Sequence, residues 1–466
     1  MISLIISCVC TILALALSWF FSPWTYRGYP KSAPLKNTAP IPDKRDLSEK
    51  ITYWRISGIP EDCDNNKLMD CLRDFDKSFK IEPSDLSLYP GCYDRKQVAV
   101  IRTKGSPDSF RRIKSEASYF MIPGLSTDGV MVDRNFYHLT PLNRPEDGDD
   151  MIDVIAVAGL EGHAIESWRN TKSGEMWLQN HLPKDIKNIR ILTYGYNTDL
   201  IGDTMEDTIL DLRSNLFTHL LNVRKTAQEK KRPIIFIGHG FGGILILQTL
   251  LESKSRKIYE HILNATRALF FFGVPHQGFR TSKLEARIKD MSRDGDPSAA
   301  VMLLEKLRQN SEFLISQRND LVDIWDKINL YSFYEKVKTP IIVQTASGQC
   351  EPKERAEETV QKMSSRLFMP REIAVGVSKT HSEMIRFISD EDPTYITFKR
   401  NMEEEVANVL ESLEEEKNEP KEFLFKLSEP QTRSLPAPIG YHAGYSFSGF
   451  NGTISSVTEH IETESS

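Results

Sequence analysis

The segment from Pro233 to Leu247 constrains the fold of this chain more than any other stretch. Ile234–Ile237 are four consecutive apolar residues, which predict a buried strand. A glycine-rich turn follows directly, Gly238-His239-Gly240-Phe241-Gly242-Gly243, and Ile244–Leu247 then begin an apolar helix. A strand that turns sharply through glycines into a helix is the arrangement called a nucleophile elbow, written G-x-S-x-G. The tip of this elbow is Gly240, and no other G-x-S-x-G occurs in the chain.

Apolar runs alternate with helical segments from Asp153 onward, a pattern typical of a parallel sheet wound with crossover helices. Short unbroken apolar strands are expected when helices cover both faces of the sheet. The predicted strands are 154–157, 189–193, 234–237, 269–272, 330–333, 341–343 and 373–375. Residues 209–224 predict a core-facing helix, and 282–326 predict helices placed as a cap. The chain is therefore expected to hold an α/β-hydrolase domain over 150–415, a doubly wound parallel sheet with a helical cap.

Five stretches resemble the serine-active-site-containing protein family, whose members are lipase-like α/β-hydrolases related to the inositol deacylases of GPI anchors. They are VIAVAGLEGHAIESW from Val154, MWLQNHLPKDIKNIRILTYGYNT from Met176, PIIFIGHGFGGILI from Pro233, LFFFGVPHQGF from Leu269 and THSEMIRF from Thr380. Their order and spacing span about half of the chain. The chain is especially similar to fungal members that precede NACHT or ankyrin modules or stand alone.

The resemblance implies a catalytic set of nucleophile, acid and base in that chain order. Gly240 occupies the nucleophile position, so the attacking hydroxyl is absent. His381, in THSEMIRF, matches the general base, and Glu335 is the best candidate for the orienting acid. Glu335 is equally well explained as a solvated charge at a strand end. Loss of the serine of a hydrolase lowers turnover by about six orders of magnitude.

The implied oxyanion hole uses the backbone amide of Phe241 and one from the Leu160–Gly162 loop. The lipase-type His-Gly pair before that loop is replaced by Ala158-Gly159. His163 and His239 are expected to complete the wall of the pocket. His276, in VPHQG, is expected to be a packing or turn histidine.

The N-terminal segment, 1–26, is predicted to be a transmembrane anchor. Ile2–Phe21 is uncharged and long enough to span a bilayer, Trp19 and Trp24 mark an interfacial belt, and basic residues follow in the predicted linker, 27–47. This orients the remainder toward the cytosol, and the endoplasmic reticulum and the mitochondrion are both compatible membranes. The alternative is a cleaved signal peptide, although no basic residue precedes the apolar run.

Residues 48–135 predict a small α+β module that resembles a ferredoxin-like or RNA-recognition fold. Strands are expected at 51–56 and 97–102, and helices at 64–79 and 106–118. RNA binding needs aromatic side chains on the central strands, where this chain has Arg55, Val98 and Val100. We therefore expect a structural or interaction role for the module and no nucleic-acid partner.

Residues 428–466 predict a disordered tail, rich in Ser, Gly and Pro. Within it, 445–457 alternates polar and apolar residues without charge, a pattern that can template cross-β assembly. The net charge of −6 calls for no polyanionic partner, and the six cysteines show no metal-ligand spacing. No cofactor is expected, since the chain has neither a phosphate loop nor a dinucleotide fingerprint.

Three functions remain open. The first is a pseudo-hydrolase, anchored to a membrane, that binds a lipid, an acyl ligand or a protein partner. The second is an active ester hydrolase or lipase with an unrecognised nucleophile, or with His381 activating water. The third is a fungal signalling or effector protein that acts through assembly of its tail.

Overall fold

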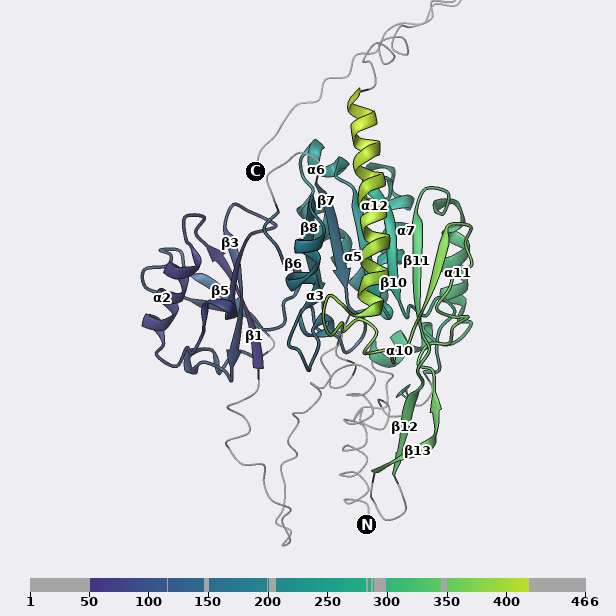
Figure 1. The fold of residues 1–466 in the computed structure, drawn as a ribbon, viewed down its shortest axis with the longest axis horizontal. Coiled ribbons are helices and arrows are strands. Elements are labelled where there is room, and N and C mark those ends of the chain that lie inside the picture. The colour runs from purple at the N-terminus through teal and green to yellow at the C-terminus, as the bar shows by residue number, and fades with distance from the viewer. Residues whose placement is uncertain are drawn as a thin grey trace, which may run out of the picture. The chain divides into compact units, whose positions relative to one another are not determined.

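The computed structural model describes residues 51–418 except 115, 146–150, 199, 201–206, 282–283, 286–287, 289–298 and 345–349 (Figure 1). The predicted anchor (1–26), linker (27–47) and tail (428–466) lie outside these residues. None of the helices in the described part combines the length and the apolar character needed to cross a bilayer.

A seven-stranded sheet forms the centre of the larger domain. Every pairing in it is parallel except that of the edge strand β6, which runs antiparallel to β8. Its order is β14 (Glu372–Val377), β11 (Asn329–Glu335), β10 (Thr266–Phe272), β9 (Ile234–His239), β7 (Ile152–Val157), β8 (Ile189–Gly195) and β6 (His138–Pro141). The sequence pattern correctly predicted six of these seven strands.

Two details of the predicted sheet are wrong. The sheet includes β6, so the domain begins before residue 150; this four-residue strand ends in Pro141 and carries no apolar run to mark it. The apolar run 341–343 is not a strand of the sheet. It lies in β12 (Thr339–Gln344), which pairs antiparallel with β13 (Cys350–Glu357) as a separate hairpin. A run of three apolar residues does not distinguish a sheet strand from a hairpin strand.

Helices cover both faces of the sheet, as the unbroken apolar strands predict. Successive side chains of a strand point to opposite faces. Ile155 and Val157 therefore join one core cluster, and Val154 and Ala156 join the other. The first cluster includes α5 (Ile209–Asn222), α7 (Phe241–Ser255) and α8 (His261–Ala265), and the second includes α3 (Trp177–Asn180), α4 (Leu182–Asp185) and α12 (Pro393–Asn418).

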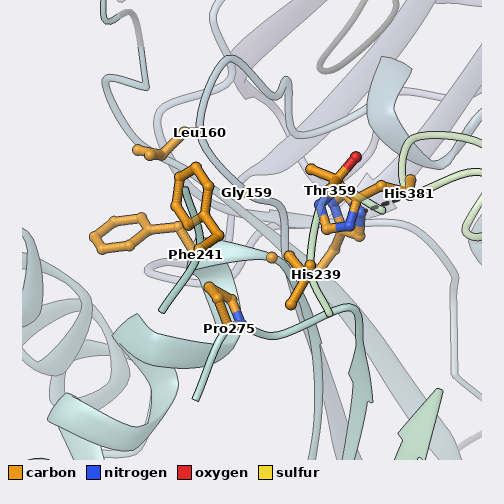
Figure 2. Close-up of a pocket in the computed structure, with 10 residues that line it drawn as sticks. Gly159, Leu160, His239, Phe241, Pro275, Thr359 and His381 are labelled. Carbon is orange, nitrogen blue, oxygen red and sulfur yellow. Dashed lines mark hydrogen bonds between the residues drawn. The ribbon is translucent and has the colours of Figure 1, made fainter. Parts of the chain in front are cut away.

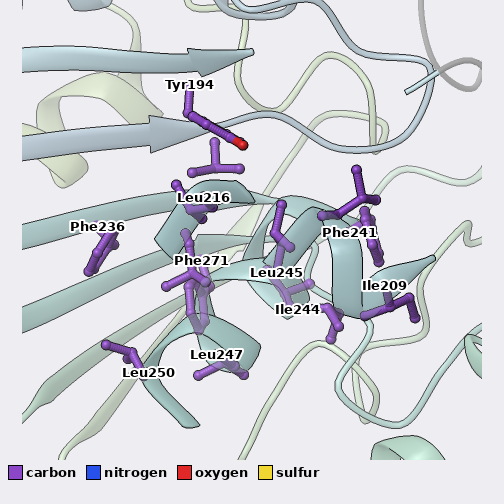
Figure 3. Close-up of a cluster of buried hydrophobic side chains, with 14 of the residues drawn as sticks. Tyr194, Ile209, Leu216, Phe236, Phe241, Ile244, Leu245, Leu247, Leu250 and Phe271 are labelled. Atoms are coloured by element: carbon purple, nitrogen blue, oxygen red, sulfur yellow. The ribbon is translucent and has the colours of Figure 1, made fainter. Parts of the chain in front are cut away.

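The first cluster is centred on α7, which is apolar on every side and almost wholly buried. In Figure 3, Ile244, Leu245 and Leu247 of α7 lie beside Phe236 of β9 and Phe271 of β10. Each fully buried side chain of this size contributes roughly 1.5–3 kcal/mol relative to an exposed one. Burial on this scale fixes α7, and with it the turn that begins at Gly240.

The expected helical cap is not observed in the described residues. Helices α10 (Ala299–Lys306) and α11 (Glu312–Asp320) bury Leu304 and Leu314 in the first cluster. The side-chain oxygen of Gln317 in α11 accepts a 2.7 Å hydrogen bond from the side-chain amide of Gln248 in α7. The apolar faces of these two helices pack into the core cluster centred on α7.

The smaller module is a five-stranded antiparallel sheet with one α-helix. Its strand order is β2 (Leu86–Pro90), β3 (Gln97–Lys104), β1 (Ile51–Ile59), β5 (Val130–Asp133) and β4 (Ser118–Phe120), and its helix is α2 (Asn65–Phe75). The helix predicted over 106–118 is wrong: one 3₁₀ turn, Asp108–Phe110, stands there. Phe110 and Ile113 are the residues of this segment in the module's core cluster, too few for a helical stripe. A ferredoxin-like fold requires two helices, so the module departs from it.

One face of the module's sheet packs against the larger domain. Tyr53, Tyr89 and Val100 belong to the same core cluster as α12. Gln179 of α3 donates a 2.7 Å hydrogen bond to the hydroxyl of Tyr89. Arg55 of β1 donates a 2.9 Å hydrogen bond to the hydroxyl of Thr140 in β6. These contacts use the sheet face on which an RNA-recognition fold would carry its stacking aromatics.

Candidate functional site

The elbow predicted from the glycine pattern is formed at the end of β9. Gly240 has φ 52° and ψ −124°, in the positive-φ region that favours glycine, and α7 begins at the next residue. A Cβ at Gly242 would overlap the carbonyl of Val157, and a Cβ at Gly243 would overlap Val274. The turn is therefore tight because strand β7 and the 273–276 loop lie directly against its backbone.

Gly240 and His381 lie side by side although they are far apart in the sequence. A Cβ built on Gly240 would be 3.3 Å from Nε2 of His381. The imidazole is accommodated by Gly273, where a Cβ would be 2.7 Å from the ring. The side chain of His381 is buried and lines the pocket. A residue with a side chain at position 240 would face this histidine.

Glu335 lies at the end of β11, behind His381. Its Oε1 is 3.9 Å from Nδ1 of His381 and accepts a 2.6 Å hydrogen bond from the amide of Val360. Burial raises the pKa of Glu335 to about 8 and holds the pKa of His381 well below its usual range. Burial thus disfavours the charged form of each group. The two groups are placed as a pair, with Oε1 and Nδ1 3.9 Å apart.

His239, the residue before the tip, holds the loop that carries His381. Its Nε2 lies 3.1 Å from the backbone oxygen of His381, and the two rings are 4.6 Å apart. Because a carbonyl only accepts, Nε2 of His239 carries the proton. Burial lowers the pKa of His239 to about 4. His239 is thus a neutral donor that positions His381.

The predicted oxyanion residues are only partly brought together. The amide of Phe241 is the first in α7 and has no acceptor within the helix. No backbone hydrogen bond among the described residues uses the amide of Leu160. Gly162 does not line the pocket, and its amide donates to Gly159 at 3.1 Å. Phe241 and Leu160 both line the pocket, and the amide of neither has a backbone acceptor among the described residues.

These groups surround a pocket with an empty volume of about 350 Å³, including space open to solvent (Figure 2). Its walls are mostly apolar, and Thr359 provides the one hydroxyl among them. The lining residues are Gly159, Leu160, His239, Gly240, Phe241, Pro275, Phe279, Thr359, Val360 and His381. Sequence reasoning did not find Thr359 and Val360, because they follow the β12–β13 hairpin and match no motif. It also missed Gly273, whose only signal is its place after an apolar strand.

The other two histidines considered from the sequence lie away from the pocket lining. Nε2 of His163 is 2.8 Å from the backbone oxygen of Arg134, so this ring joins the loop before β6 and does not form a pocket wall. His276 is fully buried, with its ring 5.5 Å from that of Phe271. It occupies a packing position. The described residues contain no group of three or more His, Cys, Asp or Glu side chains that would hold a metal ion.

Comparison with known proteins finds similarity over part of the chain. No protein-family model matches. Protein SERAC1 of Homo sapiens is 30% identical over 156 residues, which are 29% of this chain and 23% of that protein. Protein SERAC1 of Bos taurus is 28% identical over 210 residues, which are 41% of this chain and 31% of that protein. The chain thus spans less than a third of the length of these curated relatives.

Among solved structures, the mature lipase BlEst2 of Bacillus licheniformis aligns with 57% of this chain and 98% of its own, at 14% identity and a TM-score of 0.39. A phospholipase PlaB of Legionella pneumophila aligns with 62% of this chain and 66% of its own, at 13% identity and a TM-score of 0.33. The strand order with one antiparallel edge strand, the elbow after β9 and the sequence similarity to SERAC1 together identify the larger domain as α/β-hydrolase-like.

Proposed function

We propose that this chain is a pseudo-hydrolase: an α/β-hydrolase-like protein of lipase or esterase type that binds a lipid or acyl ligand, or a protein partner, without turning it over. The observation that carries the proposal is Gly240. The elbow keeps the positive φ that a serine would need, and His381 stands 3.3 Å from the position of the missing Cβ, but there is no hydroxyl to attack.

The acid and base support the same reading. A serine hydrolase needs an ionised acid to stabilise the imidazolium that forms when the base takes the proton of the nucleophile. Here burial disfavours the ionised form of Glu335 and raises its pKa to about 8. Its Oε1 is 3.9 Å from Nδ1 of His381, beyond hydrogen-bond reach. The site therefore has the scaffold of a hydrolase without its charge arrangement.

Hydrolysis of p-nitrophenyl butyrate and hexanoate by the full chain tests the proposal. We expect the natural protein to match the buffer blank, because loss of a serine nucleophile costs about six orders of magnitude. Gly240→Ser should gain measurable turnover, and Gly240→Ser/His381→Ala should lose it again. Turnover by the natural protein above the blank would contradict the proposal.

A second candidate function is an active ester hydrolase that uses another nucleophile. The observation in its favour is that Thr359, which carries a hydroxyl, lines the pocket together with His381. A fluorophosphonate probe labels only an activated nucleophile. Labelling of the natural protein that disappears in Thr359→Val would favour this candidate, and no labelling would count against it.

The finer assignments are also proposals. The apolar segment 1–26 supports a single-pass anchor with the domains toward the cytosol, at the endoplasmic reticulum or the mitochondrion. The alternating segment 445–457 supports a role in assembly. Fractionation of cells that express the full chain, with and without 1–26, tests the first of these.

A further inference from the structure

A basic and partly apolar surface lies at the base of the β12–β13 hairpin (Figure 1), beside the pocket. Thr359 and Val360 line the pocket, and the exposed Lys362 and Met363 follow them in the chain. The backbone oxygen of Met363 accepts a 3.0 Å hydrogen bond from Gln277, in the loop after β10 that also lines the pocket. Residues before the hairpin complete this hairpin-base surface, whose members are Lys336, Val337, Lys338, Lys362 and Met363.

The two parts of the hairpin-base surface meet at Tyr334, near the end of β11. Nζ of Lys362 lies 4.7 Å from the centroid of the Tyr334 ring. A Cβ at Gly376 would be 2.8 Å from Cδ of Lys336 and 3.0 Å from the hydroxyl of Tyr334, so Lys336 lies beside the same ring. The surface is therefore continuous, although the hairpin separates its two parts in the sequence.

This surface carries positive charge that the described residues do not neutralise. All three lysine side chains are exposed, and none of them forms an ion pair within the described part of the chain. Lys379, after β14, differs from them because it is paired with Asp392 at 2.5 Å. Glu358, the acid that precedes the second part of the surface, is half-buried. Val337 and Met363 are 41% and 59% exposed, so apolar surface lies among the ammonium groups.

We propose that the hairpin-base surface docks on the anionic headgroups of a lipid bilayer. The ammonium groups lie at the phosphates, and Val337 and Met363 enter the boundary between headgroups and acyl chains. Binding of this kind draws on attraction to anionic lipids and on burial of apolar side chains. Docking in this orientation turns the pocket toward the bilayer, whose hydrocarbon suits its apolar walls. The inference rests on the proposed membrane location and names the face that meets the bilayer.

The start of the described chain favours a bilayer over an acidic protein as the partner. Tyr53, close to the start of β1, accepts a 3.3 Å hydrogen bond from Arg169, in the loop after β7. The neighbouring Asn170 donates a 2.9 Å hydrogen bond to the backbone oxygen of Arg386, after β14. Both loops follow parallel strands, so they lie at the carboxyl edge of the sheet, where the pocket is. The chain therefore enters β1 at this edge, and the predicted anchor precedes β1 in the sequence.

Lysine acetylation of the full chain in nanodiscs tests the docking. The chain is reconstituted in phosphatidylcholine and in an equimolar mixture of phosphatidylcholine and phosphatidylserine, treated with an N-hydroxysuccinimide ester of acetate, and analysed by mass spectrometry. Each lysine near an anionic surface strengthens binding about fivefold. We therefore expect Lys336, Lys338 and Lys362 to react at least about fivefold more slowly in the anionic nanodiscs. Lys231 and Lys257, exposed at the opposite edge of the sheet, should react equally in both.

Salt and a charge variant test whether the protection is electrostatic. It should disappear at about 1 M salt, where the Debye length is about 3 Å. In Lys336→Gln/Lys338→Gln, docking should weaken about 25-fold, and Lys362 should lose most of its protection. The matched control is Lys231→Gln/Lys257→Gln, which removes the same charge from the opposite edge and should leave the protection of Lys362 unchanged.

Equal acetylation of the surface lysines in the two nanodiscs, or equal protection of the control lysines, would overturn the inference and leave the proposed anchor in place. Soluble polyglutamate added to phosphatidylcholine nanodiscs is a further arm. Protection there, without protection in anionic nanodiscs, would assign the surface to an acidic protein instead. Co-elution reports on the anchor: a chain that elutes with anionic nanodiscs alone would contradict the anchor and support the surface, and one that elutes with neither would contradict both.

Discussion

Gly240 removes the chemistry of the elbow without removing its shape. A non-glycine residue held in a disfavoured backbone region costs about 1–3 kcal/mol, and glycine avoids this cost. The turn does not depend on the tip residue, because Gly238 packs against Gly243 and Gly242 packs against the carbonyl of Val157. This explains why the position of a nucleophile is kept in a chain that has none. Gly240→Ser therefore brings back about 1–3 kcal/mol of backbone strain while the turn around it stays in place.

Gly273 should control whether His381 can serve a restored nucleophile. An added Cβ at Gly273 would be 2.7 Å from the ring of His381, so the imidazole must move away from position 240. We expect Gly240→Ser/Gly273→Ala to lose most of the p-nitrophenyl hexanoate turnover gained by Gly240→Ser, with the remaining fold retained by circular dichroism.

The control for this prediction is Gly240→Ser/Gly174→Ala. Gly174 has a φ of 76°, close to the 58° of Gly273, so both substitutions introduce similar backbone strain. The space around Gly174 is open, and we expect full activity there. Equal activity in the two double variants would show that the contact between Gly273 and His381 does not position the base.

At the scale of elements, Asp153 joins two strands and the end of a helix. Its buried carboxylate pairs with Arg190 of β8 at 2.8 Å and with the fully buried Arg224, just after α5, at 2.6 Å. Removal of one partner from a buried ion pair leaves an uncompensated charge, which costs about 3–5 kcal/mol. We expect Asp153→Ala to lower the free energy of unfolding by this amount in urea titrations.

The matched control for Asp153→Ala is Asp74→Ala. Asp74 pairs with Lys77 at 2.8 Å, but both side chains are about 80% exposed. Exposed pairs contribute little, so we expect no measurable change in the urea midpoint. If Asp153→Ala were equally silent, the network of arginines around it would not be a stabilising feature of the sheet.

The sequence predicted those elements whose apolar residues follow the spacing of a buried strand or helix. Strands β7 to β11 are each built around a short run of mostly apolar, buried residues because helices cover both faces, and α5 repeats apolar residues at helical spacing. Strand β6 is short and lies at the edge, and 106–118 contributes two residues to the module's core cluster, so the local sequence pattern predicts neither element. The helices of 299–320 were predicted, but which surface they cover depends on tertiary packing alone.

The site residues also fall into those that a local motif predicts and those that depend on tertiary packing. Gly240, His239 and Phe241 follow from one local motif, and His381 and Glu335 follow from their places after strands. Thr359 and Val360 reach the pocket only through the course of the chain after β13. The separation of 3.9 Å between Glu335 and His381, and the burial that raises the pKa of one and lowers that of the other, are properties of packing that no residue spacing encodes.

At the scale of the whole molecule, buried histidines should make the protein sensitive to acid. Burial is the first cause of a lowered pKa at seven histidines: His138, His163, His219, His239, His261, His276 and His381. In the unfolded chain a histidine titrates near pH 6.5. As the pH falls below this value, the unfolded chain takes up protons that the folded protein does not, so stability is lost.

Glu335 acts in the opposite direction. Its raised pKa means that the folded protein binds this proton at a pH where the unfolded carboxyl is ionised, so its stabilising contribution is present at low pH and lost as the pH rises toward 8. Below pH 6.5 the histidines outnumber it. We therefore expect the free energy of unfolding, measured in urea, to fall from pH 6.5 to about 4, by up to roughly 1.4 kcal/mol per pH unit for each of the buried His239, His276 and His381 and by less for the more exposed histidines.

His276→Leu isolates one contribution to this acid sensitivity. His276 is fully buried, its ring nitrogens have no hydrogen-bond partner among the described residues, and burial lowers its pKa to about 3. An apolar side chain of similar size removes an unpaired polar group, so stability at pH 7.5 should be unchanged or slightly raised. The variant should also lose less stability than the natural protein between pH 6.5 and 4. An identical pH dependence in the two proteins would mean that His276 takes up a proton without unfolding, and that its packing in the first core cluster is looser than its full burial implies.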